Sequence, residues 1–134
     1  KTTYINAVTT ALLKYIENLR NYVSEFCGLV LANANTTEQN EKIDRLRFAI
    51  KLHLNRKNHF DVKVLEQLDK IPNFTSQDKK DELHSNLTQL TNLMQDIFSL
   101  EWDGIRLEAT SGKPTEKEKE NFTNKHKKNY GKNI

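Results

Sequence analysis

The stretch DELHSNLTQLTNLMQDIFSLEWDGIRLEA, residues Asp81 to Ala109, is one of the two longest uninterrupted helical patterns in the chain and decides the fold. Its apolar residues recur at alternating steps of four and three, which places them on one face of a helix. They are Leu83, Leu87, Leu90, Met94 and Ile97, and the face then moves over by one residue to Phe98, Trp102 and Ile105. Because an α-helix drifts against a 3.5-residue repeat, this shift favours a globular bundle over a long coiled coil.

Two residues near the end of this stretch carry separate predictions. The spacing of Trp102 on the shifted apolar face predicts a core anchor, and an aromatic on a binding surface is the alternative. Gly104 is unfavourable inside a helix, so it indicates a kink or a close contact with another helix. Gly112 and Pro114 supply the stop signal for the helix.

Two more helices are predicted before this one. Residues 3–32 carry two adjacent apolar seams, so the first helix is expected to contact at least two partner helices. Thr36 followed by Gln39 is a capping-box pattern that opens the second helix. The apolar face of this second helix is Ile43, Leu46, Ile50 and either His53 or Leu54. Phe48 and Leu52 lie off that face, which predicts a second neighbour for them.

A short helix is expected between the second helix and the long final one. Asp61 is the candidate cap for a helix over Val62–Ile71, which Pro72 ends because proline cannot continue the hydrogen-bond ladder. Thr75 or Ser76 is then the candidate cap of the long helix.

Length and composition set the class of protein. At 134 residues one domain is expected, and only four Gly and two Pro interrupt the periodic segments. The single Cys27 excludes an internal disulfide, and its place in an apolar stripe predicts a buried, inert thiol. The sequence has no run of about 18 apolar residues that would span a membrane. We therefore predict an all-α, antiparallel helical bundle of three long helices and a short helix over residues 1–112.

The basic character of the chain belongs to its C-terminal extension, residues 113–134. Seven Lys against three Glu give this extension a charge of +4, so the total of +3 leaves −1 for residues 1–112. A solvated extension is the plain interpretation. The alternatives are a salt-sensitive nucleic-acid arm and a contact with anionic lipid. The binding residues in these alternatives would be Lys125, Lys127, Lys128 and Lys132.

Arg47 and His53 are the candidate catalytic residues. The spacing Arg-x5-His resembles the Arg-x(4–6)-His pattern of helical toxin ribonucleases of the HEPN type, at these two residues only. The resemblance implies RNA cleavage, with the histidine as general base or acid and the arginine on the phosphate. Six positions advance about 600° around a helix, so the two side chains would converge only at a dimer seam or a helix break. A boundary histidine with satisfied hydrogen bonds is the alternative.

No other constellation indicates a cofactor, a metal or a small-molecule substrate. His53, Arg56 and His59 would need a turn to gather, and no Cys or carboxylate pair completes a metal site. Glu101 and Asp103 diverge on a helix, so they do not form the carboxylate pair of a glycosidase. We expect neither a metal nor a cofactor.

A second resemblance rests on two short motifs, Leu52-His53-Leu54-Asn55 followed by His59, and the stretch Leu100–Ala109. Both are similar to motifs of a loose class of uncharacterised bacterial helical domains, many of which follow an N-terminal membrane anchor. Arg56 departs from that pattern, which has Pro at this corner. The resemblance implies a cytosolic helical domain behind an anchor, and no activity.

The prediction for function is a non-catalytic helical interaction or scaffold domain with a protein partner or as a homodimer. It would be cytoplasmic, or the cytosolic part of a membrane-anchored protein. The ribonuclease that uses Arg47 and His53 and the nucleic-acid-binding accessory protein that uses the Lys-rich extension are the alternatives.

Overall fold

The structure is a computed structural model that describes the backbone of residues 2–111 and the side chains of residues 7–107. This part of the chain contains helices and turns and no strand, which confirms the all-α prediction. The elements are α1 (Thr2–Ala32), α2 (Thr37–His53), α3 (His59–Asp69), a 3-10 turn η1 (Gln77–Lys79) and α4 (Lys80–Ser111). The predicted extension over residues 113–134 lies outside the described residues.

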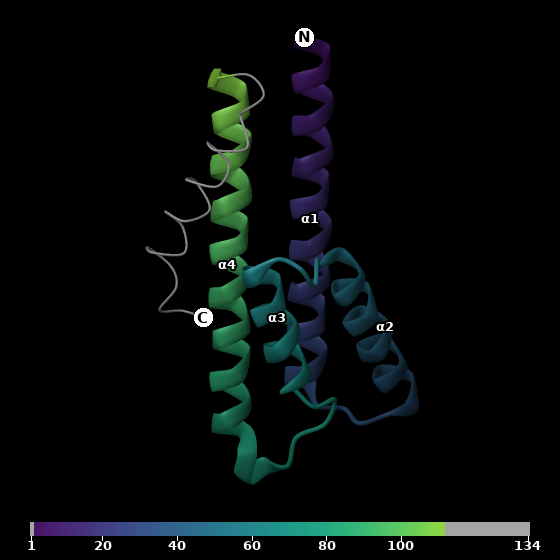
Figure 1. Cartoon of the computed structure of the whole chain (residues 1–134). Coiled ribbons are helices and arrows are strands. Elements are labelled where there is room, and N and C mark those ends of the chain that lie inside the picture. The colour runs from purple at the N-terminus through teal and green to yellow at the C-terminus, as the bar shows by residue number, and fades with distance from the viewer. Residues whose placement is uncertain (1, 112–134) are drawn as a thin grey trace.

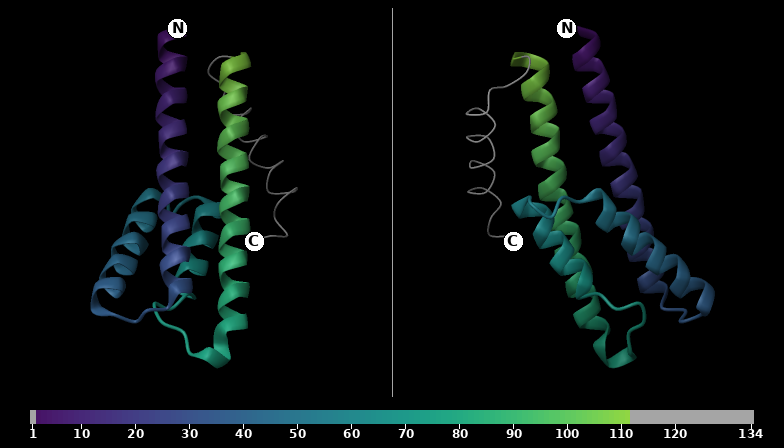
Figure 2. Two further views of the ribbon diagram at one scale, coloured as in Figure 1. Left: turned by 180° about the vertical axis from the view of Figure 1, so that it is seen from behind. Right: turned by 45° about the vertical axis from the view of Figure 1, so that its right-hand side comes forward.

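Two long helices form the frame of the molecule. α1 and α4 have 31 and 32 residues and lie side by side in opposite directions, whereas α2 and α3 have 17 and 11 residues (Figure 1). α2 packs on α1, and α3 packs on α4. Seen from behind, the α1–α4 pair lies in front of the two shorter helices (Figure 2). The N-terminal part of α1 and the C-terminal part of α4 extend beyond them as a two-helix projection (Figures 1 and 2).

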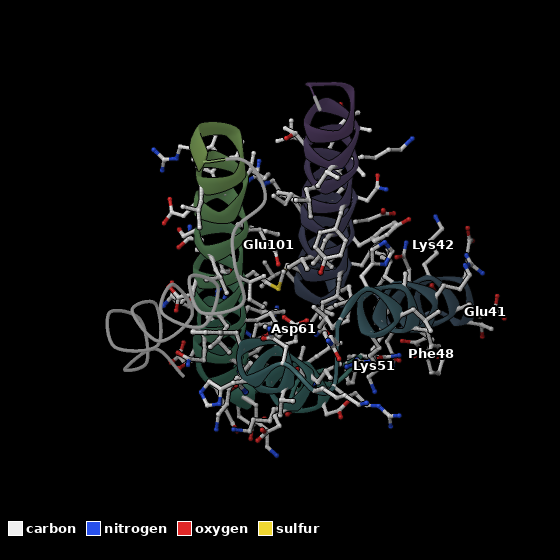
Figure 3. All side chains as sticks on the ribbon, turned by 45° about the horizontal axis from the view of Figure 1, so that its top comes forward. Glu41, Lys42, Phe48, Lys51, Asp61 and Glu101 are labelled. Carbon is white, nitrogen blue, oxygen red and sulfur yellow. The ribbon has the colours of Figure 1, made fainter. Side chains whose placement is uncertain are left out.

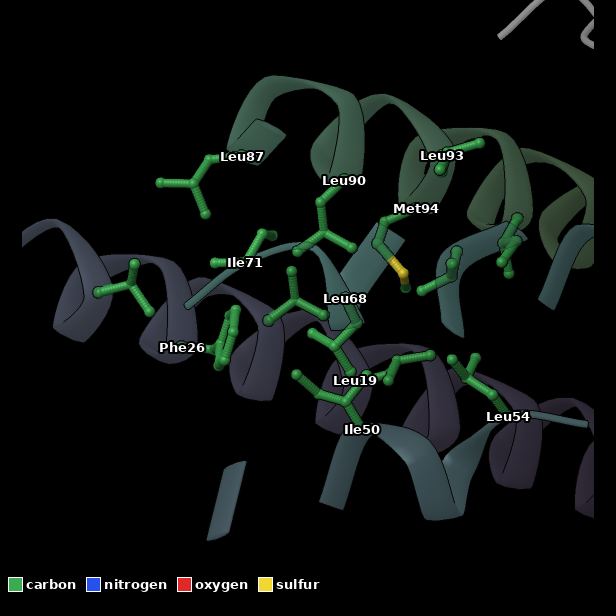
Figure 4. Packing of buried hydrophobic residues seen from close by; sticks show 14 of the residues in the cluster. Leu19, Phe26, Ile50, Leu54, Leu68, Ile71, Leu87, Leu90, Leu93 and Met94 are labelled. Carbon is green, nitrogen blue, oxygen red and sulfur yellow. The ribbon is translucent and has the colours of Figure 1, made fainter. Parts of the chain in front are cut away.

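The core lies where all four helices meet (Figure 4). Leu19 and Phe26 from α1, Leu68 from α3 and Leu90 from α4 have no exposed surface. The predicted seam of α4 is confirmed, because Leu83, Leu87, Leu90, Met94 and Ile97 are all buried. The 3.6-residue periodicity of the sequence thus identifies the buried faces correctly in the middle of the molecule.

Local side-chain chemistry explains the turn between α1 and α2. Asn33 and Asn35 have φ values of 53° and 52°, in the left-handed region that asparagine tolerates better than most residues. Thr36 is the N-cap of α2, and its hydroxyl oxygen accepts a hydrogen bond from the Gln39 backbone N–H at 3.2 Å. The reciprocal bond of a capping box is not formed, because Gln39 Oε1 has no hydrogen-bond partner.

The start of α3 corrects the prediction that Asp61 is its cap. The N-cap is Asn58, whose side-chain oxygen accepts from the backbone N–H groups of Phe60 at 2.9 Å and Asp61 at 3.2 Å. The helix therefore begins at His59. Asp61 Oδ2 accepts instead from the backbone N–H of Asn55 at 2.8 Å, so the carboxylate fastens the preceding turn.

The start of α4 also differs from the prediction. Ser76 is the N-cap of η1, which leads directly into α4, but its side chain makes no capping hydrogen bond. Thr75 is buried, and its backbone is held by Asn33 through two hydrogen bonds. The entry to α4 is thus fixed from the end of α1 rather than by a local cap.

Two predicted packing roles are wrong, and one of the two roles predicted for Gly104 is excluded. The Trp102 side chain is 47% exposed and does not anchor the core. A Cβ added at Gly104 would meet nothing within 4 Å, so no close contact with a described helix explains this glycine, and the kink stays a prediction. Phe48 and Leu52 are 63% and 85% exposed, so no second helix of the described part of the chain covers them. The common reason is that periodicity shows which residues share a face but not which faces another helix covers.

Candidate functional site

Arg47 is a structural clamp between α2 and the C-terminal end of α3. Nη1 donates to the Leu68 carbonyl at 2.7 Å, and Nη2 donates to the Ile71 carbonyl at 2.9 Å and to Asn73 Oδ1 at 2.7 Å. The guanidinium also lies 5.0 Å from the ring centroid of Phe26 on α1. Burial lowers the pKa of Arg47, and the nearby Asp44 and Asp69 oppose this shift. The guanidinium satisfies carbonyl groups at a helix end that would otherwise lack partners.

His53 lies at the last residue of α2, between two tyrosines of α1. Its ring centroid is 5.9 Å from that of Tyr15 and 5.3 Å from that of Tyr22. Nδ1 lies 2.8 Å from the Ala49 carbonyl, and the Tyr15 hydroxyl donates to the His53 carbonyl at 2.9 Å. These contacts are those of a boundary histidine that joins α2 to α1.

The structure therefore gives Arg47 and His53 different surroundings. The arginine contacts α3 and the following loop, and the histidine contacts the tyrosines of α1. No contact joins the two side chains to each other among the described residues. This arrangement lends no support to the ribonuclease hypothesis, which needs both groups at one phosphodiester.

A pair of carboxylates near α1 was not predicted from the sequence. Asp61 is 8% exposed at the start of α3, and Glu101 is partly buried on α4 (Figure 3). Burial raises the pKa of both carboxyl groups, and the charge of Asp61 adds to the shift at Glu101. Burial, together with these two charges, also raises the pKa of Tyr15 to about 12. Only the tertiary contact between the first turn of α3 and α4 brings these residues together, and sequence spacing does not reveal it.

This acidic cluster does not amount to a metal site. The described residues contain no group of three or more His, Cys, Asp or Glu side chains that could hold a metal ion. Asp103 points elsewhere and pairs with Arg106 at 2.8 Å on the same helix, in line with the expected divergence from Glu101. Within the described part of the chain, no contact joins the side chains of His53, Arg56 and His59 to one another.

A groove runs along the face of the α1–α4 pair that α2 and α3 leave uncovered. Its main part has a volume of about 880 Å³, and all of its lining residues belong to α1 or α4. A neighbouring pocket shares Arg20, Phe98 and Ser99 with it and reaches Trp102 and Arg106. The two together form one surface, which we call the α1–α4 groove. The residues that line it are Ile16, Arg20, Val23, Ser24, Cys27, Thr91, Met94, Gln95, Asp96, Phe98, Ser99, Trp102, Asp103 and Arg106.

The aromatic end of this groove combines side chains that are common in protein interfaces. The Arg20 guanidinium lies 5.2 Å from the ring centroid of Phe98, and Trp102 is exposed one turn further along α4. Burial raises the pKa of the Cys27 thiol in the same groove, which keeps it in the unreactive thiol form. Cys27 is partly buried rather than buried as predicted, and its inert character stays a prediction.

The candidate binding residues Lys125, Lys127, Lys128 and Lys132 lie outside the described residues, so they stay a prediction. None of the helices in residues 2–111 combines the length and apolar character that crossing a membrane requires. No family model, curated protein or solved structure matches this chain.

Proposed function

We propose that this protein is a non-catalytic helical interaction domain that binds an amphipathic helix of a protein partner in the α1–α4 groove. The observation that carries this proposal is the uncovered face on which Arg20, Phe98 and Trp102 lie together. The function is recognition, and the α1–α4 pair supplies the platform for it.

The shape of the groove supports a helical partner. Helices in bundles bury their apolar stripes against neighbouring helices, and two adjacent helices leave a furrow that a further helix fills. α1 and α4 have neighbours on one side only, among the described residues. A helix with apolar residues at positions i, i+3, i+4 and i+7 fits such a furrow.

The side chains of the groove support the chemistry of that partner. Trp and Arg dominate the binding energy of many interfaces because each combines a large apolar surface with hydrogen-bond donors. Trp102 and Phe98 would cover large apolar side chains of the partner. The Arg20 guanidinium lies over the Phe98 ring in the groove, and a guanidinium pairs well with a carboxylate, which predicts a Glu or Asp on the partner helix.

A selection from a display library of amphipathic helical peptides tests this proposal. We expect enriched peptides to place a carboxylate about one turn from a large apolar residue. Their affinity, measured by fluorescence polarisation, should fall about tenfold or more for Trp102→Ala and several-fold for Arg20→Gln. Phe48→Gln on the far side of α2 is the matched control and should leave the affinity unchanged.

Two results would contradict the proposal. One is the absence of any enriched helical peptide. The other is binding that Trp102→Ala and Arg20→Gln leave unchanged while circular dichroism shows both variants folded.

A further inference from the structure

A second seam runs along α4, on a different face from the one that packs on α1. It consists of three leucines seven residues apart and two aspartates between them, namely Leu93, Asp96, Leu100, Asp103 and Leu107. On a helix this Leu–Asp seam lies about a third of a turn from Leu90 and Met94. It lies about half a turn from Phe98 and Trp102 of the α1–α4 groove, although its two aspartates also line that groove.

The short helix α3 covers only part of the Leu–Asp seam. Leu93 is buried and lines one pocket with Lys63 and Gln67 of α3. The C-terminal part of α4, which carries Asp103 and Leu107, extends beyond α3 (Figure 1). The short helices therefore leave this part of the seam uncovered.

The charge of α4 is opposite to that of the extension that follows it. Six acidic against two basic side chains give α4 a formal charge of −4, whereas residues 1–79 carry +3. The extension over residues 113–134 carries +4. Four of the six carboxylates belong to the second half of α4, namely Asp96, Glu101, Asp103 and Glu108. The most acidic element of the fold is thus joined directly to the basic extension.

The sequence at this junction favours a reversal of the chain. Gly112 and Pro114 are typical of a tight turn, and a short loop is the usual connection between two antiparallel helices. Thr115 followed by Glu118 is a capping-box pattern, which predicts that a helix begins directly after the turn. A helix that begins there would run back along α4.

We propose that residues 115–130 form a helix that packs antiparallel to α4 on the Leu–Asp seam. A three-residue turn pairs residues that lie equally far from its centre along the two helices. Phe122 then lies between Leu100 and Leu107, and Tyr130 lies in the next gap of the seam. Eight positions separate the two aromatic rings and seven separate successive leucines, so both rings fit gaps between leucines.

The same register brings lysines to the aspartates of the seam. Lys125 and Lys127 flank the helix face that carries Phe122, and their long side chains would reach Asp103 and Asp96. The Asp96 side chain is only 6% exposed, and a carboxylate removed from water is stabilised by a nearby cation. Asp103 pairs with Arg106 on its own helix, so Lys125 would join this pair rather than replace it.

The covalent link favours this occupant of the seam over a separate molecule. A tethered segment acts at an effective concentration of about millimolar, so a few weak ion pairs and two aromatic rings suffice to hold it. The carboxylates of α4 would repel the phosphates of a nucleic acid or an anionic lipid beside the extension. We therefore assign the lysines of the extension to α4 first.

Paramagnetic relaxation enhancement, measured by NMR on the whole chain, tests the proposal. A nitroxide is attached at Lys128→Cys, on the outer side of the proposed helix, in a Cys27→Ser background. The amide signals of residues 94–102 should be lost, because the nitroxide lies across from them. Those of residues 80–84, at the start of α4, should remain.

Variants separate the contribution of the carboxylates from that of the aromatic ring. Asp96→Asn combined with Asp103→Asn should recover the lost signals, whereas Glu82→Gln at the start of α4 is the control and should recover none. Phe122→Ser should also recover them and lies outside the four-helix core, so it tests the seam even if the aspartate variants fold poorly. Asn124→Ser, on the opposite face of the proposed helix, is its matched control.

Three results would overturn the proposal. One is the persistence of every α4 signal in the spin-labelled chain, and binding of a DNA duplex or of anionic phospholipid vesicles by that chain would then assign the lysines to phosphate. Another is signal loss that both the paired aspartate variant and Phe122→Ser leave unchanged. The third is equal signal loss when spin-labelled chains are mixed with isotope-labelled chains that carry no nitroxide, which would assign the seam to the extension of a second copy.

Discussion

At the scale of single residues, Arg47 on α2 contacts both α3 and α1. One side chain on α2 binds two carbonyl groups at the end of α3, the Asn73 amide oxygen and the face of Phe26 on α1. Lysine cannot reproduce a planar group that donates in several directions at once. We expect Arg47→Lys to lower the free energy of unfolding by about 1–2 kcal/mol and Arg47→Ala by about 2–4 kcal/mol. Urea unfolding measures both, and a fully stable Arg47→Lys variant would contradict the clamp.

Asn33 has two functions that different substitutions separate. Its backbone is left-handed at φ 53°, and its amide pairs with the Thr75 backbone at 2.7 and 2.9 Å. Asn33→Gly keeps the backbone conformation but loses both hydrogen bonds, so we expect a loss of about 1–2 kcal/mol in unfolding free energy. Asn33→Ala adds strain of about 1 kcal/mol. Equal stability of the Gly and Ala variants in thermal unfolding would exclude a contribution from the left-handed conformation.

The raised pKa values of Asp61 and Glu101 predict a pH dependence of stability. A carboxyl group whose pKa is higher in the folded than in the unfolded state binds its proton more tightly when folded. The two protonated carboxyl groups therefore make their full contribution to the free energy of unfolding below their unfolded pKa values of about 4. It is lost as the pH rises through their folded pKa values. Glu101→Gln should be more stable than wild type at neutral pH, and this advantage should vanish towards about pH 4. Denaturation at a series of pH values checks this, and a constant difference would argue against the charge as the cause.

At the scale of elements, replacing either of the two helical glycines by alanine should stabilise the fold. A Cβ at Gly28 in α1 or at Gly104 in α4 would meet no atom within 4 Å. Alanine restricts the unfolded chain and favours the helix, so each substitution should raise the unfolding free energy by about 0.5–1 kcal/mol. Differential scanning calorimetry should show a higher melting temperature for each variant, and the two increases should add in the double variant. A lower melting temperature for Gly104→Ala would point to a contact at that position after all.

The helices themselves were predictable because their signals are local. The capping threonine at position 36 and the four-three steps of α4 depend on neighbours within a few residues. Asn58 was missed as the cap of α3 because Asp61 offers the same chemistry three residues later. Asp61 turned out to serve the Asn55 backbone, and only the folded turn shows this.

At the scale of the whole molecule, the placement of the short helices decides which faces remain open. α2 and α3 cover one side of the α1–α4 pair and stop short of the two-helix projection (Figure 1). The sequence shows the stripe that contains Phe98 and Trp102, but it does not show that α2 and α3 leave the outer part of this stripe uncovered. For the same reason, the sequence alone suggested Arg47 and His53 as a pair. It could not show that Arg47 contacts α3 whereas His53 contacts the tyrosines of α1.

This architecture predicts uneven protection of the backbone. Regions packed by all four helices open only on global unfolding, whereas a pair of helices without further neighbours opens locally. Hydrogen–deuterium exchange should therefore be slowest over residues 19–30 and 87–97, and faster over residues 7–14 and 101–107. Equal protection along the whole of α4 would show that the projection is as stable as the core.

The two ends of α3 respond differently to acid and base. Its C-terminal end is held by Arg47, whose guanidinium stays protonated at every pH at which proteins fold. Its N-terminal end carries Asp61, a carboxyl group that titrates and that senses the charge of Glu101. A change of pH therefore alters the charge at the N-terminal end of this helix and leaves the charge at its C-terminal end unchanged. Any effect of pH on the stability of α3 is expected at its N-terminal end, next to Glu101.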